Sequence, residues 1–213
     1  MKFFKLLITI IFTSQLSLIA QDDDIFKNIT KNILDKANTA ENTVYLSKTE
    51  KEVILYMNIA RLDGDWFIKH IYNKKISFVS SFSSSYRKSL LKDLKKTKDH
   101  PMLYPAKGLT KAARYHAKDL GKKGKTGHRS SDGTETFVRI KKYAQGGYLA
   151  ENIQYGYQSA LDIVLDLLID DGISSLGHRK NILNSNFSYV GVAIEPHKRY
   201  RINCVQDFSD MGD

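Results

Sequence analysis

The sequence predicts an α+β fold, and three observations support this. Segments with apolar side chains at helical spacing dominate the chain up to residue 143, whereas strand-like runs occur only after residue 150. A further helical segment separates the first strand from the last two, and this mixture is typical of α+β proteins. The 213 residues suffice for one domain with its own hydrophobic core.

The first predicted helix opens at residues 47–50, Ser-Lys-Thr-Glu, which have the form of a capping box. Val53, Met57 and Ala60 form its apolar stripe. It is expected to end near Leu62, because Gly64 follows as a stop signal.

Two more helices are predicted in the middle of the chain. The first runs from Thr110 to about Lys122, and Gly121 and Gly124 are expected to end it. After an Asp-Gly turn at 132–133, the second runs from about Thr134 to Tyr143.

The last third of the chain supplies the sheet. We expect a first strand over 151–155, a helix capped by Ser159 that runs to Ile169, and two final strands over 189–195 and 199–208. Residues 196–198, Pro-His-Lys, are the predicted hairpin turn between these strands.

The N-terminus has the pattern of a secretory signal peptide over residues 1–20. Lys2 and Lys5 precede a short apolar run, and Ala20 precedes a polar stretch, so the mature chain is expected to start near Gln21. An uncleaved N-terminal anchor is the alternative, although the run is short and impure for a membrane span. We expect a polar leader over 21–45 and one domain over 46–213, with a helical insertion at about 65–100.

The net charge and the cysteine content limit the expected partners and disulfide bonds of this protein. The net charge is +10, or about +8 without the two lysines of the signal peptide, and lysines concentrate at 88–98 and 118–125. These lysines form either a solvated helix face or a surface for anionic envelope polymers or lipid headgroups. No nucleic-acid-binding motif is visible, so nucleic acid is not an expected partner. Cys204 is the single cysteine, which excludes an internal disulfide, and we expect it to be buried.

Three short motifs carry the candidate chemistry: Gly-His at 127–128, Glu-Asn-Ile at 151–153 and Gly-His-Arg at 177–179. The intervals between them are long enough for separate helices or strands. If the fold brings them together, two histidines and a carboxylate share one cleft, which can bind a divalent metal or perform acid–base chemistry.

The order and spacing of these motifs resemble the CAP superfamily, the cysteine-rich secretory, antigen 5 and pathogenesis-related proteins, in its bacterial single-domain form. The resemblance runs from about residue 46 to residue 209. It also includes Asn58 and Arg61 in the first helix, the block at 109–119 and the final strand at 204–208.

The resemblance implies a three-layer α-β-α sandwich with a small central antiparallel sheet and a central groove. It assigns the two groove histidines to His128 and His178 and one acid to Glu151. The second acid falls at Asp170 or Asp171, and Asn152 is expected to bond backbone groups around the groove. The two histidines are the candidate ligands for zinc or another divalent metal. His116 lies on the apolar stripe of its helix and is expected to be structural.

These observations leave three functions open. The first is an exported protein, secreted or periplasmic, whose groove binds a metal or a small-molecule, lipid or polysaccharide ligand. The second is a metal-dependent hydrolase of peptidase type with Glu151 as general base. The third is an interaction module with a structural histidine cluster. A Gly-x-Ser-x-Gly elbow and a His-Glu-x-x-His helix are both absent from the sequence, which disfavours peptidase activity.

Overall fold

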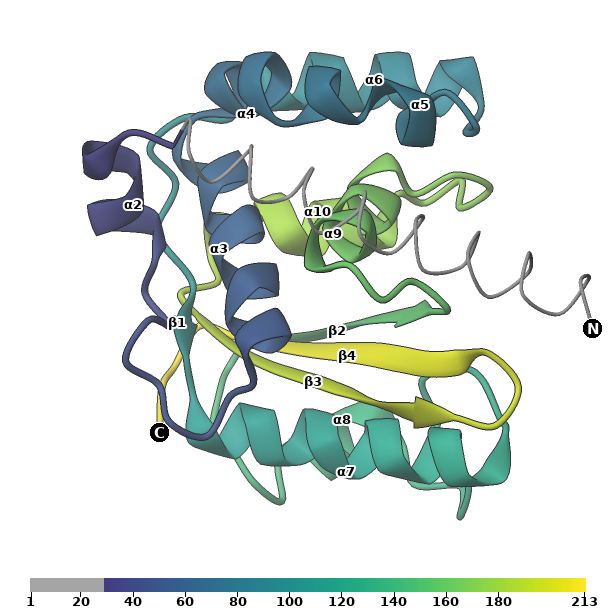
Figure 1. The fold of residues 1–213 in the computed structure, drawn as a ribbon. Coiled ribbons are helices and arrows are strands. Elements are labelled where there is room, and N and C mark those ends of the chain that lie inside the picture. Colours follow the sequence, from purple (N-terminus) through teal and green to yellow (C-terminus); the bar gives the residue numbers. More distant parts are fainter. Residues whose placement is uncertain (1–28) are drawn as a thin grey trace, which may run out of the picture.

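The computed structural model describes residues 29–213, so the predicted signal peptide and mature N-terminus lie outside the described residues. Helices dominate the first part of the described chain, and the three long strands lie in the last third of the sequence, as predicted (Figure 1). The helices are α2 (Lys31–Ala37), α3 (Lys48–Leu62), α4 (Gly64–His70), the 3₁₀ helix η1 (Tyr72–Lys75), α5 (Ile76–Val79), α6 (Ser84–Leu94), α7 (Lys107–Lys123), α8 (Thr136–Ile140), α9 (Ala160–Ile169) and α10 (Gly177–Leu183). The strands are β1 (Tyr104–Pro105), β2 (Leu149–Tyr155), β3 (Tyr189–His197) and β4 (Arg201–Ser209).

The strands form one sheet in the order β1-β3-β4-β2. β4 is the central partner, because it pairs antiparallel with β3 along one edge and with β2 along the other. The short β1 adds a parallel pair to β3, so the sheet is antiparallel except at this edge. In the shared register Gly191, Asp207 and Glu151 lie side by side across β3, β4 and β2.

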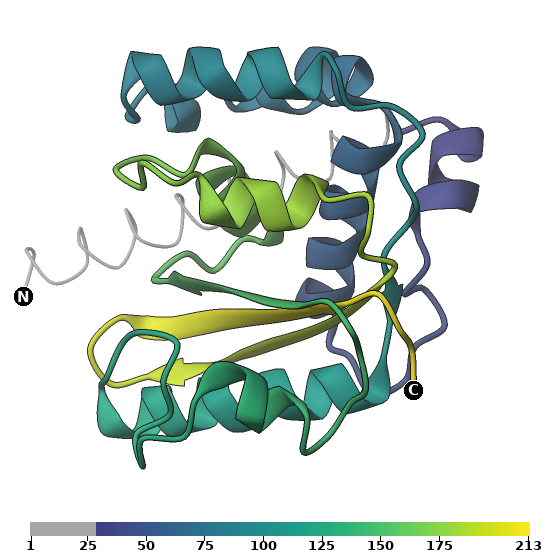
Figure 2. The ribbon, with the colours of Figure 1, turned by 180° about the vertical axis from the view of Figure 1, so that it is seen from behind.

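Helices cover both faces of the sheet, as the α+β prediction requires. α7 and α8 lie on one face, and α3, α9 and α10 lie on the other (Figures 1 and 2). The segment from α4 to α6 forms a further helical layer outside α9 and α10. No helix within residues 29–213 is both long and apolar enough to cross a membrane.

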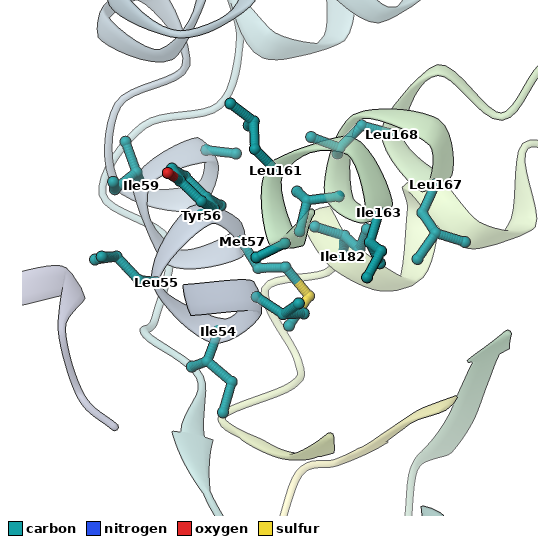
Figure 3. Close-up of a cluster of buried hydrophobic side chains, with 14 of the residues drawn as sticks. Ile54, Leu55, Tyr56, Met57, Ile59, Leu161, Ile163, Leu167, Leu168 and Ile182 are labelled. Atoms are coloured by element: carbon teal, nitrogen blue, oxygen red, sulfur yellow. The ribbon is translucent and has the colours of Figure 1, made fainter. Parts of the chain in front are cut away.

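The main core lies between α3, α9 and the adjoining face of the sheet. Met57 of α3 lies between its own helix and the apolar side chains of α9 and α10 (Figure 3). α3 and α9 are buried over most of their length, which fits the apolar runs at 53–57 in α3 and at 163–165 and 167–169 in α9. Cys204 is fully buried in this core and unpaired, as predicted.

Several predicted boundaries are confirmed by their caps. The side chain of Ser47 accepts a hydrogen bond from the amide of Glu50, and the side chain of Glu50 accepts one from Ser47, which completes the capping box. Ser159 caps α9 in the same way. α7 ends at Gly124, whose φ of 67° is the left-handed conformation typical of a C-cap.

α3 ends at Leu62, as predicted, but a new helix follows at once, because Asp63 ends α3 and at the same time caps α4 through the Trp66 amide. The predicted turn at 196–198 lies two residues too early: Pro196 and His197 continue β3, and the chain turns over 198–200. Pro is tolerated here because β1 pairs only with the start of β3, so that β3 is an edge strand at Pro196.

Two elements and one region differ from the prediction. α10 and β1 were not predicted, because seven and two residues are too short to show a clear period. The segment at 65–100 forms α4, η1, α5 and α6 rather than one or two helices.

Candidate functional site

His128 and Glu151 form the first half of the site. His128 lies in the loop between α7 and α8, and its Nδ1 donates to Oε1 of Glu151 at 2.8 Å. The other carboxylate oxygen accepts from Nη2 of Arg139 on α8. Glu151 and Arg139 are buried with side chains 1% exposed, whereas the imidazole of His128 is 54% exposed. The carboxylate is therefore held inside the protein, and the imidazole is the group presented to solvent.

The loop that carries His128 is held from two sides. The carbonyl of His128 accepts hydrogen bonds from Thr136 and from Nη1 of Arg139, at 3.0 and 2.9 Å. Gly127, with φ of 104°, donates its amide to the hydroxyl of Tyr155 at 3.0 Å and accepts from Nε2 of His116 through its carbonyl. Burial raises the pKa of Tyr155 to about 12, so its hydroxyl stays neutral.

His178 and Asp170 form the second half of the site. Nδ1 of His178 donates to Oδ1 of Asp170 at 2.7 Å, and Oδ2 accepts the backbone amides of His178 and Arg179. Asp170 ends α9 in the left-handed conformation, with φ of 58°, which Asp tolerates better than most residues. The His178 side chain is 23% exposed and Asp170 is buried.

β2 links the two halves through adjacent residues. Glu151 holds His128, and the side-chain amide of Asn152 donates to the carbonyl of His178 at 3.1 Å. Asn181, one turn after His178 on α10, donates to Oδ1 of Asn152 at 2.9 Å. These bonds fix the start of α10 against the same strand that positions His128.

A cavity of about 410 Å³ opens beside His128. Its lining includes Glu151 of β2 and Asn181 of α10, together with Thr136 and Phe137 of α8. The Phe137 ring is an apolar wall that is 53% exposed. The hollow therefore joins one exposed aromatic ring to an imidazole, an amide and a hydroxyl, which is the usual make-up of a ligand site.

The two acids proposed for the second position have different surroundings. Asp170 contacts His178, whereas Asp171 is turned away and accepts the amide and hydroxyl of Ser83, at 2.8 and 3.0 Å. Of the predicted residues, the structure thus brings His128 to Glu151, and His178 to Asp170 and Asn152. Asp171 lies apart from them.

Three ionisable residues near the site were not identified from the sequence. Arg139 neutralises Glu151 across the α8–β2 contact. Asp207, opposite Glu151 in the sheet, has a pKa raised well above its usual range by burial and by the charge of Glu151, which favours the protonated acid. Asp166 on α9 has a pKa raised to about 6, mainly by burial. Asp207 was visible as an acid within a predicted strand, but Arg139 gave no signal, because a single arginine in a helix is ordinarily exposed to solvent.

The donor set limits how a metal could be held. Each imidazole uses Nδ1 on a carboxylate, so Nε2 remains as the ligand atom, an arrangement common behind metal-binding histidines. Both carboxylates are already engaged, Glu151 by Arg139 and Asp170 by backbone amides. Within residues 29–213, no group of three or more His, Cys, Asp or Glu side chains is arranged to hold a metal ion. The described residues therefore do not form a closed structural metal site.

The other described histidines have structural contacts. His116 is buried, and burial lowers its pKa, so the neutral form donates to Gly127. His197 is buried in the β3–β4 hairpin, where it bonds to the carbonyl of Lys125 and accepts the amides of Arg199 and Tyr200.

Comparison with known families gives one match that covers most of the chain. The family model for the cysteine-rich secretory protein family, CAP, matches residues 56–208. A comparison with curated proteins found no significant match.

Comparison with solved structures gives three bacterial proteins. An extracellular protein containing an SCP domain from Bacillus anthracis is 23% identical, with a TM-score of 0.45, over 52% of this chain and 34% of that one. An outer surface protein from Borrelia burgdorferi is 22% identical, with a TM-score of 0.45; the match covers 59% of this chain and 92% of that one. A cysteine-rich secretory protein from Staphylococcus aureus is 15% identical, with a TM-score of 0.41; the match covers 60% of this chain and 37% of that one. The chain therefore spans only about a third of two of these proteins.

Proposed function

The chain belongs to the cysteine-rich secretory protein family, CAP, and from this premise we propose that it is an exported binding module. Its ligand occupies the cavity beside His128, with His178 at the same end of β2. Export rests on the signal-peptide pattern of residues 1–20 and places the protein in the periplasm or outside the cell.

One observation carries the preference for binding over hydrolysis. Both oxygens of Glu151 are engaged, one by His128 and one by Arg139, and the side chain is 1% exposed. A general base must reach the water from which it takes a proton. Glu151 instead orients the imidazole of His128, which supports a positioning role and disfavours the hydrolase.

The ligand is proposed to be a lipid or polysaccharide-type molecule. The cavity offers the Phe137 ring for an apolar or sugar face, and it offers His128 and Asn181 for hydrogen bonds. A divalent ion such as zinc is the second candidate, because the carboxylates that hold His128 and His178 leave Nε2 of each as a ligand atom. Such an ion would supply positive charge for an anionic group of the ligand.

The test is an NMR titration of the mature protein with three probes: zinc, an N-acetylglucosamine oligomer and a short-chain phosphatidylcholine. At least one probe is expected to shift the signals of His128 and Asn181 selectively, and His128→Ala should abolish these shifts. His70→Ala is the matched control, because that histidine ends α4, stacks on Trp66 and does not line the cavity. The proposal fails if none of the three probes moves these signals, or if both variants respond alike.

Turnover is tested separately with unfolded casein, with and without zinc. No cleavage is expected. Cleavage that is lost in Glu151→Gln would promote the hydrolase and overturn the binding module.

A further inference from the structure

Helix α7 carries a row of lysines on its outer side. Lys107, Lys111, Lys118 and Lys122 are all exposed. At 100° per residue they fall within about 60° of one another around the helix axis, and at 1.5 Å per residue they extend over about 22 Å. We call this row the α7 lysine stripe.

Two hollows lie along the stripe. The first, of about 550 Å³, is lined by Lys107 and Lys111 from α7 and by Lys141 and Lys142 from the segment after α8. The second, of about 480 Å³, is lined by Lys118 and Lys122 and by Lys198 at the β3–β4 turn. Segments far apart in the sequence therefore add three more lysines beside the stripe.

The carboxylates near the stripe have partners inside the fold. Glu195 pairs with Arg114 at 3.0 Å and with Lys118 at 3.8 Å. Asp119 accepts the amide of Ser131 at 2.6 Å. Within residues 29–213, no ion pair joins Lys107, Lys111 or Lys122 to a carboxylate, so the stripe keeps an excess of positive charge.

The first hollow already holds one anionic group. Both oxygens of the Asp213 side chain accept the amide of Gly108, at 2.9 Å each, in the first turn of α7. A Cβ at Gly108 would lie 2.6 Å from this carboxylate, so the glycine permits its approach. This end of the stripe thus accommodates a carboxylate against the backbone of α7, inside a hollow that lysines also line.

We propose that the α7 lysine stripe binds a linear, phosphate-bearing polymer of the cell envelope. The location of this partner rests on the proposed export of the protein. An extended chain matches a row of charges about 22 Å long that is flanked by two hollows. A lipid surface fits less well, because helices that bind in the membrane interface present large apolar side chains. The exposed large hydrophobic residue on α7 is Tyr115, at 45%.

The molecule contains its own control for non-specific charge effects. Lys88, Lys92 and Lys95 are exposed along α6 and at its C-cap. α6 lies in the outer layer opposite α7 (Figure 1). A triple Lys→Gln change at 88, 92 and 95 alters the net charge as much as a triple change at 107, 111 and 122. Gln has nearly the same helix propensity as Lys, so both variants are expected to fold.

The experiment measures binding of labelled inorganic polyphosphate to the mature protein at several salt concentrations. The α7 triple variant is expected to bind about tenfold more weakly, with a salt-dependence slope smaller by about two, since three phosphate contacts are lost. The α6 triple variant should change binding less than about threefold.

Equal weakening in both variants would overturn the proposal and assign the binding to net charge. Tighter binding to single-stranded DNA or to anionic vesicles than to polyphosphate would overturn the assigned partner. His128→Ala should bind polyphosphate normally, so failure of the stripe and failure of the His128 cavity are separate results.

Discussion

At the scale of single residues, the site depends on how two carboxylates are used. Glu151 and Asp170 each hold the Nδ1 of a histidine, and each is buried and fully engaged. Their negative charges are balanced differently, by Arg139 for Glu151 and by two backbone amides for Asp170. The carboxylates therefore fix the direction of the imidazoles rather than facing a ligand themselves.

Glu151→Gln is expected to destabilise the protein by about 3 kcal/mol, because it leaves the buried guanidinium of Arg139 without a countercharge. Glu135→Gln is the control, since Glu135 pairs with Arg129 where both side chains are more than half exposed. That variant should lose less than about 1 kcal/mol. Urea unfolding measures both, and equal losses would contradict the role assigned to Arg139.

The raised pKa of Asp166 leads us to expect that the stability of the protein depends on pH. Its pKa is raised to about 6 in the folded state, mainly by burial, so between about pH 4 and 6 the folded protein keeps a proton that the unfolded chain releases. Stability from this group is present at low pH and is lost as the pH rises through about 6. Asp166→Asn should therefore be more stable than the wild type at pH 7.5, by at most about 3 kcal/mol, and equal to it near pH 4.

The control for this pH dependence is Asp171→Asn, which should behave in the opposite way. The pKa of Asp171 is lowered by the Ser83 amide, so its charged form stabilises the fold. This variant should be less stable near neutral pH, and the difference should vanish as the pH falls through the folded pKa. The unfolding curves are measured from about pH 2.5 to 7.5, because the folded pKa of Asp171 lies below the usual aspartate value. Curves for Asp166→Asn that run parallel to the wild type would refute the assignment for Asp166.

At the scale of elements, α7 packs directly on the backbone of β3. A Cβ added at Gly191 would lie 2.1 Å from both the carbonyl carbon of Leu109 and the amide nitrogen of Thr110. The close approach brings α7 onto the sheet beside Asp207 and Glu151, which share a register position with Gly191. The helix that carries the lysine stripe is thereby held against the strands that carry the site.

Gly191→Ala is expected to cost at least about 3 kcal/mol, because the helix must move away from the strand. Gly177→Ala is the matched control. A Cβ there would meet only Ser175 Oγ at 3.5 Å, so its stability should change by less than about 1 kcal/mol. Thermal unfolding measures the stability of both variants. A Gly191→Ala protein as stable as the wild type would show that α7 can shift freely.

At the scale of the whole molecule, Arg61 connects segments that are distant in sequence. It is fully buried on α3 and donates to the carbonyls of Pro101, Ile182, Asn184 and Phe187 at 2.6 to 2.9 Å. It thus joins α3 to the approach to β1, to the end of α10 and to the loop before β3. Burial lowers its pKa to about 10, so it stays charged at neutral pH.

Arg61→Lys should cost more than about 2 kcal/mol, because an ammonium group cannot reach all four carbonyls and buried acceptors remain unpaired. Arg114→Lys is the control, since Arg114 is 30% exposed and pairs with carboxylates that a lysine can also neutralise. Its loss should be below about 1 kcal/mol. Chemical denaturation measures both variants. Equal losses of unfolding free energy in Arg61→Lys and Arg114→Lys would contradict the role of Arg61 in joining distant segments.

The sequence by itself determined the class of fold, the long helices α3, α7 and α9, the strands β2 to β4 and the family. These features depend on local signals: periodic apolar residues, the caps at Ser47, Ser159 and Gly124, and motifs in a fixed order. It also identified His128, Glu151 and His178 as the residues to examine. It could not choose between Asp170 and Asp171, because adjacent residues share the same local sequence.

Only the tertiary structure decided what these residues contact. Arg139 faces Glu151, Asp207 lies opposite Glu151, and Arg61 reaches carbonyls more than a hundred residues away because separate segments pack together. The short elements α10 and β1 likewise form against neighbours rather than from their own propensity. The physical reason is that burial and charge pairing depend on distances in space, which local sequence patterns do not encode.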